Sequence, residues 1–101
     1  MIQANFKCSR KKLIGFSVSG HSGYDDEGFD IVCASVSSAV MLVCNAITEV
    51  YKLPADINVG DNVISCEISS DDTLLIDALK LHLSALAEDY PENISVTISE
   101  V

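Results

Sequence analysis

Hydrophobic residues recur with two different periods along this chain, and the period changes several times between its ends. Apolar and polar residues alternate over residues 2–8 and again over residues 14–18. A period of two is typical of a strand with one buried face. The polar residues 9–12 between these stretches are few enough for a hairpin turn. The start of the chain therefore predicts two antiparallel strands.

From about residue 31 to residue 51 the apolar period becomes helical, with no internal proline or glycine. Its stripe consists of Val36, Val40, Val43, Ile47 and Val50, and further apolar residues widen it. A helix that is apolar around so much of its circumference is buried on more than one side. We expect one side of this helix to pack on the sheet and another side to pack on a second helix or on a second copy of the chain.

The second half of the chain repeats this scheme. Alternation over residues 57–59 and 64–68, around a tight turn, predicts a second hairpin. Leucines at helical spacing over residues 75–86 predict a second helix, and alternation over 94–98 predicts a last strand. The order β-β-α-β-β-α-β predicts a single α+β domain over residues 1–101. We expect a two-layer sandwich, with a mainly antiparallel sheet that carries both helices on one face.

Composition limits the partners of this domain. It has 15 acidic and 6 basic residues, a formal net charge of −9. Because phosphate binding needs a basic surface, we expect no direct nucleic acid partner. The acidic surface either favours encounter with basic proteins or only keeps an apolar domain soluble. No stretch of about 18 apolar residues or signal-peptide pattern is apparent, so we expect a cytoplasmic protein without membrane contact.

The four cysteines differ in their expected surroundings. Their spacing contains no C-x-x-C element, so we expect free thiols and no metal or cofactor. Cys8 and Cys66 occupy inward strand positions and Cys44 lies mid-helix, which favours core roles. Cys33 instead lies near the start of the predicted helix. There the helix dipole lowers the pKa of a thiol, and unpaired backbone N–H groups can bind an oxyanion.

The polar segment before this helix contains a histidine, His21. An imidazole beside Cys33 could act as the base that a cysteine nucleophile needs. Asp30 could orient that imidazole or cap the helix, and the sequence does not choose between these roles. The loop is interrupted by glycines that permit a lid over a substrate groove, namely Gly20, Gly23 and Gly28. The alternative is an ordinary surface loop that happens to contain His21. The other histidine, His82, is expected at the edge of the second helix.

Two strings in this segment resemble a known signature. Gly20-His21-Ser22, followed by Asp30-Ile31-Val32-Cys33-Ala34-Ser35-Val36-Ser37, is similar to the signature of the ribosomal-processing cysteine proteases called Prp. In that family a Gly-His pair follows the second strand, and an Asp-apolar-Val-Cys-Ala string opens the first helix. Size, acidic character and element order also agree. Ser22 and Ser35 depart from it, since alanine is commoner at both positions.

The resemblance implies Cys33 as the nucleophile and His21 as the general base, with Asp30 and Ser37 in supporting roles. It implies a homodimeric cysteine endopeptidase that removes the N-terminal extension of ribosomal protein L27 and so aids maturation of the large ribosomal subunit. Two other classes remain: a non-catalytic, ribosome-associated binding module that uses the same groove, and a redox-sensing protein in which Cys33 is oxidised. Cleavage of an L27 peptide discriminates between them.

Overall fold

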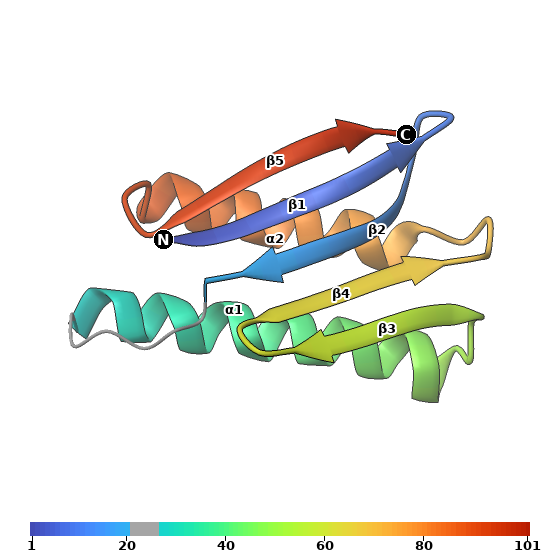
Figure 1. Ribbon diagram of the computed structural model, residues 1–101, viewed down its shortest axis with the longest axis horizontal. Helices are drawn as coiled ribbons and strands as arrows, with labels where there is room; N and C mark the ends of the chain where they lie inside the picture. Colours follow the sequence, from blue (N-terminus) through green and yellow to red (C-terminus); the bar gives the residue numbers. More distant parts are fainter. Residues whose placement is uncertain (21–26) are drawn as a thin grey trace.

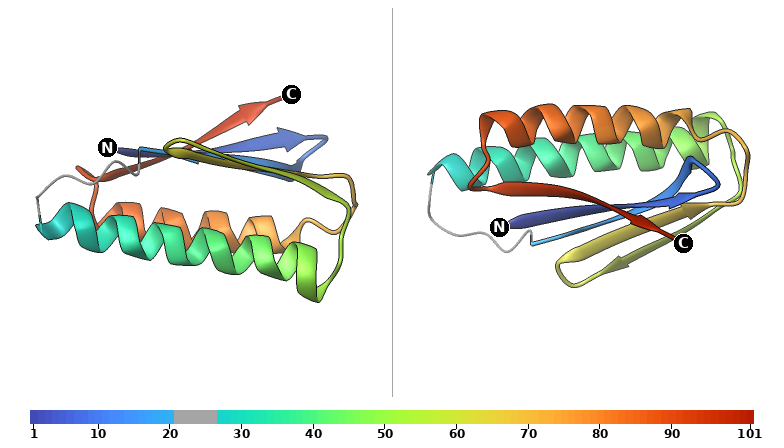
Figure 2. Two further views of the ribbon diagram at one scale, coloured as in Figure 1. Left: turned by 60° about the horizontal axis from the view of Figure 1, so that its bottom comes forward. Right: turned by 90° about the horizontal axis from the view of Figure 1, so that it is seen from above.

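The chain folds into one five-stranded sheet with two long helices on one of its faces (Figure 1). The computed structural model describes residues 1–20 and 27–101, with residues 27–30 described as helical backbone only. The elements are β1 (Ile2–Ser9), β2 (Lys12–Ser19), α1 (Glu27–Asn45), the π-helix η1 (Ala46–Val50), β3 (Ala55–Gly60), β4 (Val63–Ile68), α2 (Leu74–Asp89) and β5 (Ile94–Glu100). Both helices lie side by side on the same side of the sheet (Figure 2). The predicted architecture is confirmed.

The strands follow the order β3-β4-β2-β1-β5 across the sheet. The two hairpins supply antiparallel pairs, and β2 also pairs antiparallel with β4. β5 pairs parallel with β1 because α2 carries the chain back along the sheet before β5 begins. The face away from the helices is polar. On it Asn5 Nδ2 donates to Thr97 Oγ1 at 2.8 Å, and Lys7 Nζ lies 3.1 Å from Glu67 Oε1.

The core lies between the sheet and the helices. The rings of Phe6 and Phe16 are 6.2 Å apart and tilted by 46°, a geometry that aromatic pairs favour. The sheet-facing stripe of α1 and η1 is fully or nearly fully buried and consists of Val32, Val36, Val40, Val43 and Ile47. On α2 the buried residues are Ile76, Leu79 and Leu83. The apolar periodicity therefore identified the buried faces of both helices, except at Val50, which was predicted in the stripe and is 72% exposed at the end of η1.

The first hairpin contains a β-bulge that the alternation does not reveal. The register shifts between Lys7 and Cys8, and Cys8 pairs with Leu13. As a result Leu13 packs against the core, whereas the sequence predicted Ile14 in that place. Cys8 was also predicted to be a core residue, and it is only half-buried and lies outside the core cluster. A bulge inserts one extra residue into a strand, so it reverses which side chains face inward beyond it.

The helix that carries Cys33 is longer than the sequence predicted. It begins at Glu27 instead of about residue 31, and after Asn45 it continues as η1 to Val50. By length and composition alone, Ile31–Val50 could cross a membrane, with a mean hydropathy of 2.0. This corrects the expectation that no segment is apolar enough to do so. A core helix passes the same test, and one face of this segment is buried against the sheet.

Candidate active site

Gly20 marks the point at which the chain leaves β2. Its φ of +96° favours glycine, and a Cβ built on it would lie 2.4 Å from the carbonyl oxygen of Met1. Its backbone N–H donates to the carbonyl oxygen of Asn62 at 3.2 Å. The end of β2, the start of the chain and the β3–β4 turn thus meet at one end of the sheet (Figure 1). Residues His21 and Gly23 lie outside the described residues.

Cys33 does not lie at the helix start. Because α1 begins at Glu27, Cys33 is in its second turn, and Gly28, predicted as a loop residue, is in the first. Only the first four N–H groups of an α-helix lack an intrahelical acceptor, and the dipole acts mainly within that turn. The prediction of helix-start amides beside Cys33 is therefore wrong. The helix extends upstream because one glycine costs it only about 1 kcal/mol, and acidic residues suit a first turn.

Three of the predicted site residues share one side of α1. Asp30, Cys33 and Ser37 follow the spacing i, i+3, i+7, which brings positions to the same helix face. Cys33 and Ser37 are both half-buried, and Cys33 packs against the edge of the core. Since residues advance by about 100° around a helix, this stripe lies on the flank of α1 next to the buried stripe. The sequence-predicted residues on α1 are therefore brought together.

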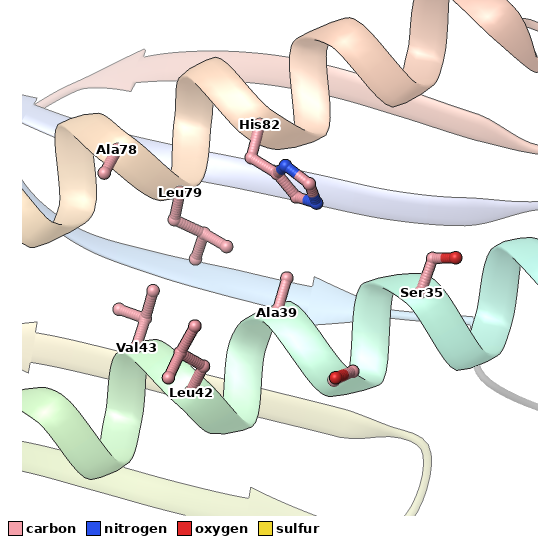
Figure 3. Close-up of a pocket in the computed structure, with 8 residues that line it drawn as sticks. Ser35, Ala39, Leu42, Val43, Ala78, Leu79 and His82 are labelled. Carbon is pink, nitrogen blue, oxygen red and sulfur yellow. The ribbon is translucent and has the colours of Figure 1, made fainter.

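The opposite flank of α1 faces α2 and forms a groove with it. The groove has a volume of about 480 Å³ and is lined by Ser35, Ser38, Ala39, Leu42, Val43, Ala78, Leu79 and His82. Figure 3 shows the His82 ring directed from α2 toward this groove. Ser35 is about 160° around the helix from Cys33. His82 and Cys33 therefore lie on different sides of α1, which excludes His82 as the base for Cys33 in this fold.

The remaining cysteines lie away from this stripe. Cys66 is 3% exposed, and burial raises the pKa of its thiol to about 11. Burial also raises the pKa of the half-buried Cys44 thiol. Both core predictions are consistent with this placement, and neither thiol is suited to nucleophilic chemistry near neutral pH. Within residues 1–20 and 27–101, no group of three or more His, Cys, Asp or Glu residues could hold a metal ion.

Sequence reasoning missed the link between Gly20 and Asn62. The residues 60–62 were recognised as a hairpin turn, but their contact with Gly20 depends on β2 lying beside β4 in the sheet. No local pattern specifies which strands become neighbours across 42 residues. The groove between the helices was missed for the same reason, because its lining comes from both α1 and α2.

Comparison with known proteins identifies relatives over nearly the whole chain. The family profile of cysteine protease Prp matches residues 1–95. A Bacillus subtilis (strain 168) protein, ribosomal processing cysteine protease Prp, is 27% identical over 108 residues and covers 96% of each chain. The Prp of Staphylococcus aureus (strain Mu50 / ATCC 700699) is 33% identical and covers 82% of this chain and 84% of that one.

Solved structures have the same fold. A crystal structure from Streptococcus mutans superposes with a TM-score of 0.89 at 31% identity, covering 100% of this chain and 99% of the other. The essential ribosomal processing protease Prp from S. aureus, crystallised with a substrate peptide, has a TM-score of 0.89 at 24% identity, covering 98% and 100% of the two chains. The profile match, the relatives and the shared fold agree. The chain belongs to the ribosomal processing cysteine protease Prp family.

Proposed function

We propose that this chain is a cysteine endopeptidase that removes the N-terminal extension of ribosomal protein L27, with Cys33 as its nucleophile and His21 as its general base. The observation that carries the proposal is the stripe of Asp30, Cys33 and Ser37 on one flank of α1. This stripe supplies a thiol nucleophile and, one turn away, an acid of the kind that orients a histidine base. Membership of a cysteine protease family supports the same assignment.

The position of His82 supports His21 as the base. The chain contains two histidines, and His82 lines the groove on the other flank of α1 from Cys33. Histidine is the commonest general base in enzymes because its pKa lies near neutral pH. His21 is also joined directly to Gly20, whose position at the end of β2 is fixed on both sides. Both observations support His21 as the base for Cys33.

The reaction proceeds in two stages. His21 takes the proton of the Cys33 thiol, and the thiolate attacks the scissile carbonyl carbon. As the tetrahedral intermediate collapses, His21 returns the proton to the leaving amine, and the new N-terminus of the mature protein departs. The other product stays bound to Cys33 as a thioester. His21 then deprotonates a water molecule that hydrolyses the thioester and regenerates the thiol.

Ser37 is proposed to stabilise the reacting carbonyl group. Because the N–H of a second-turn residue is used within the helix, the donors for an oxyanion must come from other groups than the amides around Cys33. Side chains at i and i+4 on a helix lie about 5–6 Å apart at Cβ. The Ser37 hydroxyl is thus within reach of a group bound to Cys33. Asp30 is proposed to orient His21, which would set the imidazole tautomer.

The nucleophile and base are tested with purified protein and a peptide that spans the cleavage site of L27. Cys33→Ser should abolish cleavage while retaining the fold, because a hydroxyl is far less acidic than a thiol. His21→Ala should do the same. Cys8→Ser and His82→Ala are the matched controls and should cleave as the wild type does. Normal cleavage by Cys33→Ser would refute the assignment, and a wild type that cannot cut the peptide would refute the substrate.

The net charge of −9 suits the proposed substrate. Ribosomal proteins are basic, so the field of an acidic protease would steer L27 toward it. Such steering is screened by salt, with a Debye length of about 8 Å at physiological ionic strength. The cytoplasm, where ribosomes mature, is the proposed location.

We further propose that the active form is a homodimer that associates through the outer side of α1. This helix has no charged residue from Ile31 to Thr48, in a chain that otherwise repels its own copy. Met41 and Leu42 on this side are 58% and 70% exposed. A face without charge is the surface on which two chains of net charge −9 can approach at the lowest electrostatic cost. Small side chains nearby, such as Ser38, permit close helix contact.

A further inference from the structure

β3 forms one edge of the sheet, and half of its backbone groups point away from its neighbour β4. Antiparallel partners alternate between pairs that exchange two hydrogen bonds and pairs that exchange none. The Ser69 N–H donates to the Pro54 carbonyl at 2.9 Å, which fixes the phase of this alternation. The residues of β3 that bond to β4 are therefore Asp56, Asn58 and Gly60. The residues whose N–H and C=O groups face the free edge are Ala55, Ile57 and Val59.

Within the described part of the chain, this free edge lacks the usual protection against strand addition. Proteins protect sheet edges with proline, lysine, a β-bulge or a covering helix or loop. Ala55–Gly60 contains neither proline nor lysine, and its pairing with β4 keeps one register throughout. Val59 is 75% exposed. An extended peptide can therefore add to β3 as a further strand.

The free edge of β3 lies on the side of the molecule that carries Cys33. α2 packs on β2 and β5, and α1 lies along the other half of the sheet (Figure 1). Cys33 and Cys44 share one flank of α1, because their spacing equals about three helical turns. Cys44 is close enough to Cys66 of β4 for the two thiols to interact electrostatically, and Cys66 is the partner of Ile57 in β3. The flank of Cys33 therefore faces the β3 side.

The same geometry gives the distance between the edge and the thiol. The three helical turns from Cys44 back to Cys33 correspond to about 16 Å. β3 runs toward the end of the sheet at which α1 begins (Figure 1). Because an extended chain advances about 3.3 Å per residue, about five residues connect a position opposite Ile57 with Cys33. One short peptide can thus pair with β3 and reach the thiol.

The charge of this edge suits a peptide from a basic protein. The β3–β4 hairpin contains no basic residue, and its acidic residues are Asp56, Asp61 and Glu67. Among the described residues, only Glu67 has a cation within salt-bridge distance, the Lys7 ammonium at 3.1 Å. A basic peptide is attracted to this hairpin, whereas a second copy of the chain, with its net charge of −9, is repelled.

We propose that the free edge of β3 binds the L27 peptide as an added strand and directs its scissile bond to Cys33. This inference rests on the proposed function, because the occupant is the substrate proposed for that site. The peptide backbone exchanges hydrogen bonds with the outward groups of Ile57 and Val59. Such main-chain pairing supplies affinity, and the alternate side chains of the peptide supply specificity.

The opposite edge of the sheet offers a matched control. β5 pairs parallel with β1, and the Ile2 N–H donates to the Asn93 carbonyl at 2.8 Å. Alternate residues of β5 therefore bond to β1, and the N–H groups of Val96 and Ile98 face outward. This edge lies beside α2 and away from the flank of Cys33.

The first experiment locates the peptide by amide hydrogen exchange, measured by NMR on the Cys33→Ser protein, which leaves the L27 peptide uncleaved. In the free protein the N–H groups of Ile57 and Val59 should exchange rapidly. With peptide at ten times its Kd they should exchange about 10-fold more slowly, because about a tenth of the protein remains unbound. The outward N–H groups of Val96 and Ile98 should be unaffected.

Two results of this experiment would overturn the proposal. The first is unchanged exchange at Ile57 and Val59 in the saturated complex. The second is slow exchange at these positions without peptide that becomes slower with protein concentration, since a second copy of the chain would then occupy the edge.

The second experiment compares Val59→Pro with Ile98→Pro in the cleavage assay. Each proline removes one outward N–H and no hydrogen bond of the sheet. Val59→Pro should raise KM for the L27 peptide at least about fivefold, with kcat changed by less than about threefold, because it removes substrate binding and leaves the reacting groups in place. Ile98→Pro should match the wild type.

Thermal unfolding shows whether both variants are folded at the assay temperature. Equal KM values in two folded variants would overturn the proposal, and if Val59→Pro does not fold, the exchange experiment decides alone. A wild type that does not cleave the peptide would instead refute the proposed function. Hydrogen exchange needs no cleavage, so the two failures are distinguishable.

Discussion

The substitution Gly15→Ala tests a close approach between β2 and β4. Gly15 lies in β2 between Lys7 of β1 and Glu67 of β4. A Cβ at this position would lie 2.4 Å from the carbonyl oxygen of Cys66 and 3.1 Å from the Cα of Glu67. Ordinary contact begins at 3.4 Å, so the oxygen must move away by about 1 Å. Both atoms belong to the β4 backbone, and no side chain can turn aside to make room.

The expected loss of stability follows from this geometry. Overpacking that forces backbone shifts costs typically about 1–3 kcal/mol, and a weakened hydrogen bond between β2 and β4 adds about 1 kcal/mol. We therefore expect Gly15→Ala to lower the free energy of unfolding by about 3 kcal/mol. For a domain of this size, about 1 kcal/mol corresponds to about 4–8 °C in Tm, so the expected decrease is about 12–24 °C.

The assay is thermal and urea denaturation followed by circular dichroism. Gly60→Ala is the matched control, because a Cβ there meets the Cγ1 atom of the Val63 side chain at 3.2 Å and the nearest backbone atom, the Val63 carbonyl oxygen, only at 4.0 Å. Alanine is favoured over glycine in a strand by about 0.5–1 kcal/mol, so this variant should remain within about 1 kcal/mol of the wild type. Equal stabilities of the two alanine variants would refute the argument from close strand approach.

Alkylation, charge and salt test other parts of the structure. With a pKa of about 11, the Cys66 thiol is about 0.03% ionised at pH 7.5, so iodoacetamide should label it at least about 100-fold more slowly in the folded protein than in urea. Similar rates in peptide-resolved mass spectrometry would contradict its burial. Leu42→Glu should convert dimers to monomers in light scattering, with Tm changed by only a few degrees, and a dimer that persists would exclude this face of α1. The rate of L27 cleavage should fall as salt rises, and a rate that is flat with ionic strength would exclude electrostatic steering.

Local patterns predicted most of the fold because each element here has a clear hydrophobic period. The helical stripe that includes Val36 and Val40 corresponds to a buried face, whereas the alternation in β5 does so at Ile94 but not at Ile98, which is 52% exposed. The start of α1 was placed four residues too late, since one glycine and several acids near a helix terminus change the free energy by only about 1 kcal/mol. The bulge beside Cys8 was missed because a register shift leaves no mark on the alternation itself.

The candidate site was predictable in part. Cys33 and Ser37 are one helical turn apart, so their common face follows from the sequence as soon as the helix is recognised. The exclusion of His82 needed the tertiary structure, because it depends on which flank of α1 packs beside α2. The contact between Gly20 and Asn62 also depends on strand order, which brings β4 beside β2.

The sequence by itself determined the order of the elements, most of the inward positions of its strands and helices, and the spacing of Asp30, Cys33 and Ser37. These properties follow from periods of two and 3.6 residues, which are local. Only the tertiary structure decided that Gly20 lies between Met1 and Asn62 and that the two flanks of α1 have different surroundings. Contacts between distant segments come from packing the whole sheet against both helices, and no short stretch of sequence contains that information.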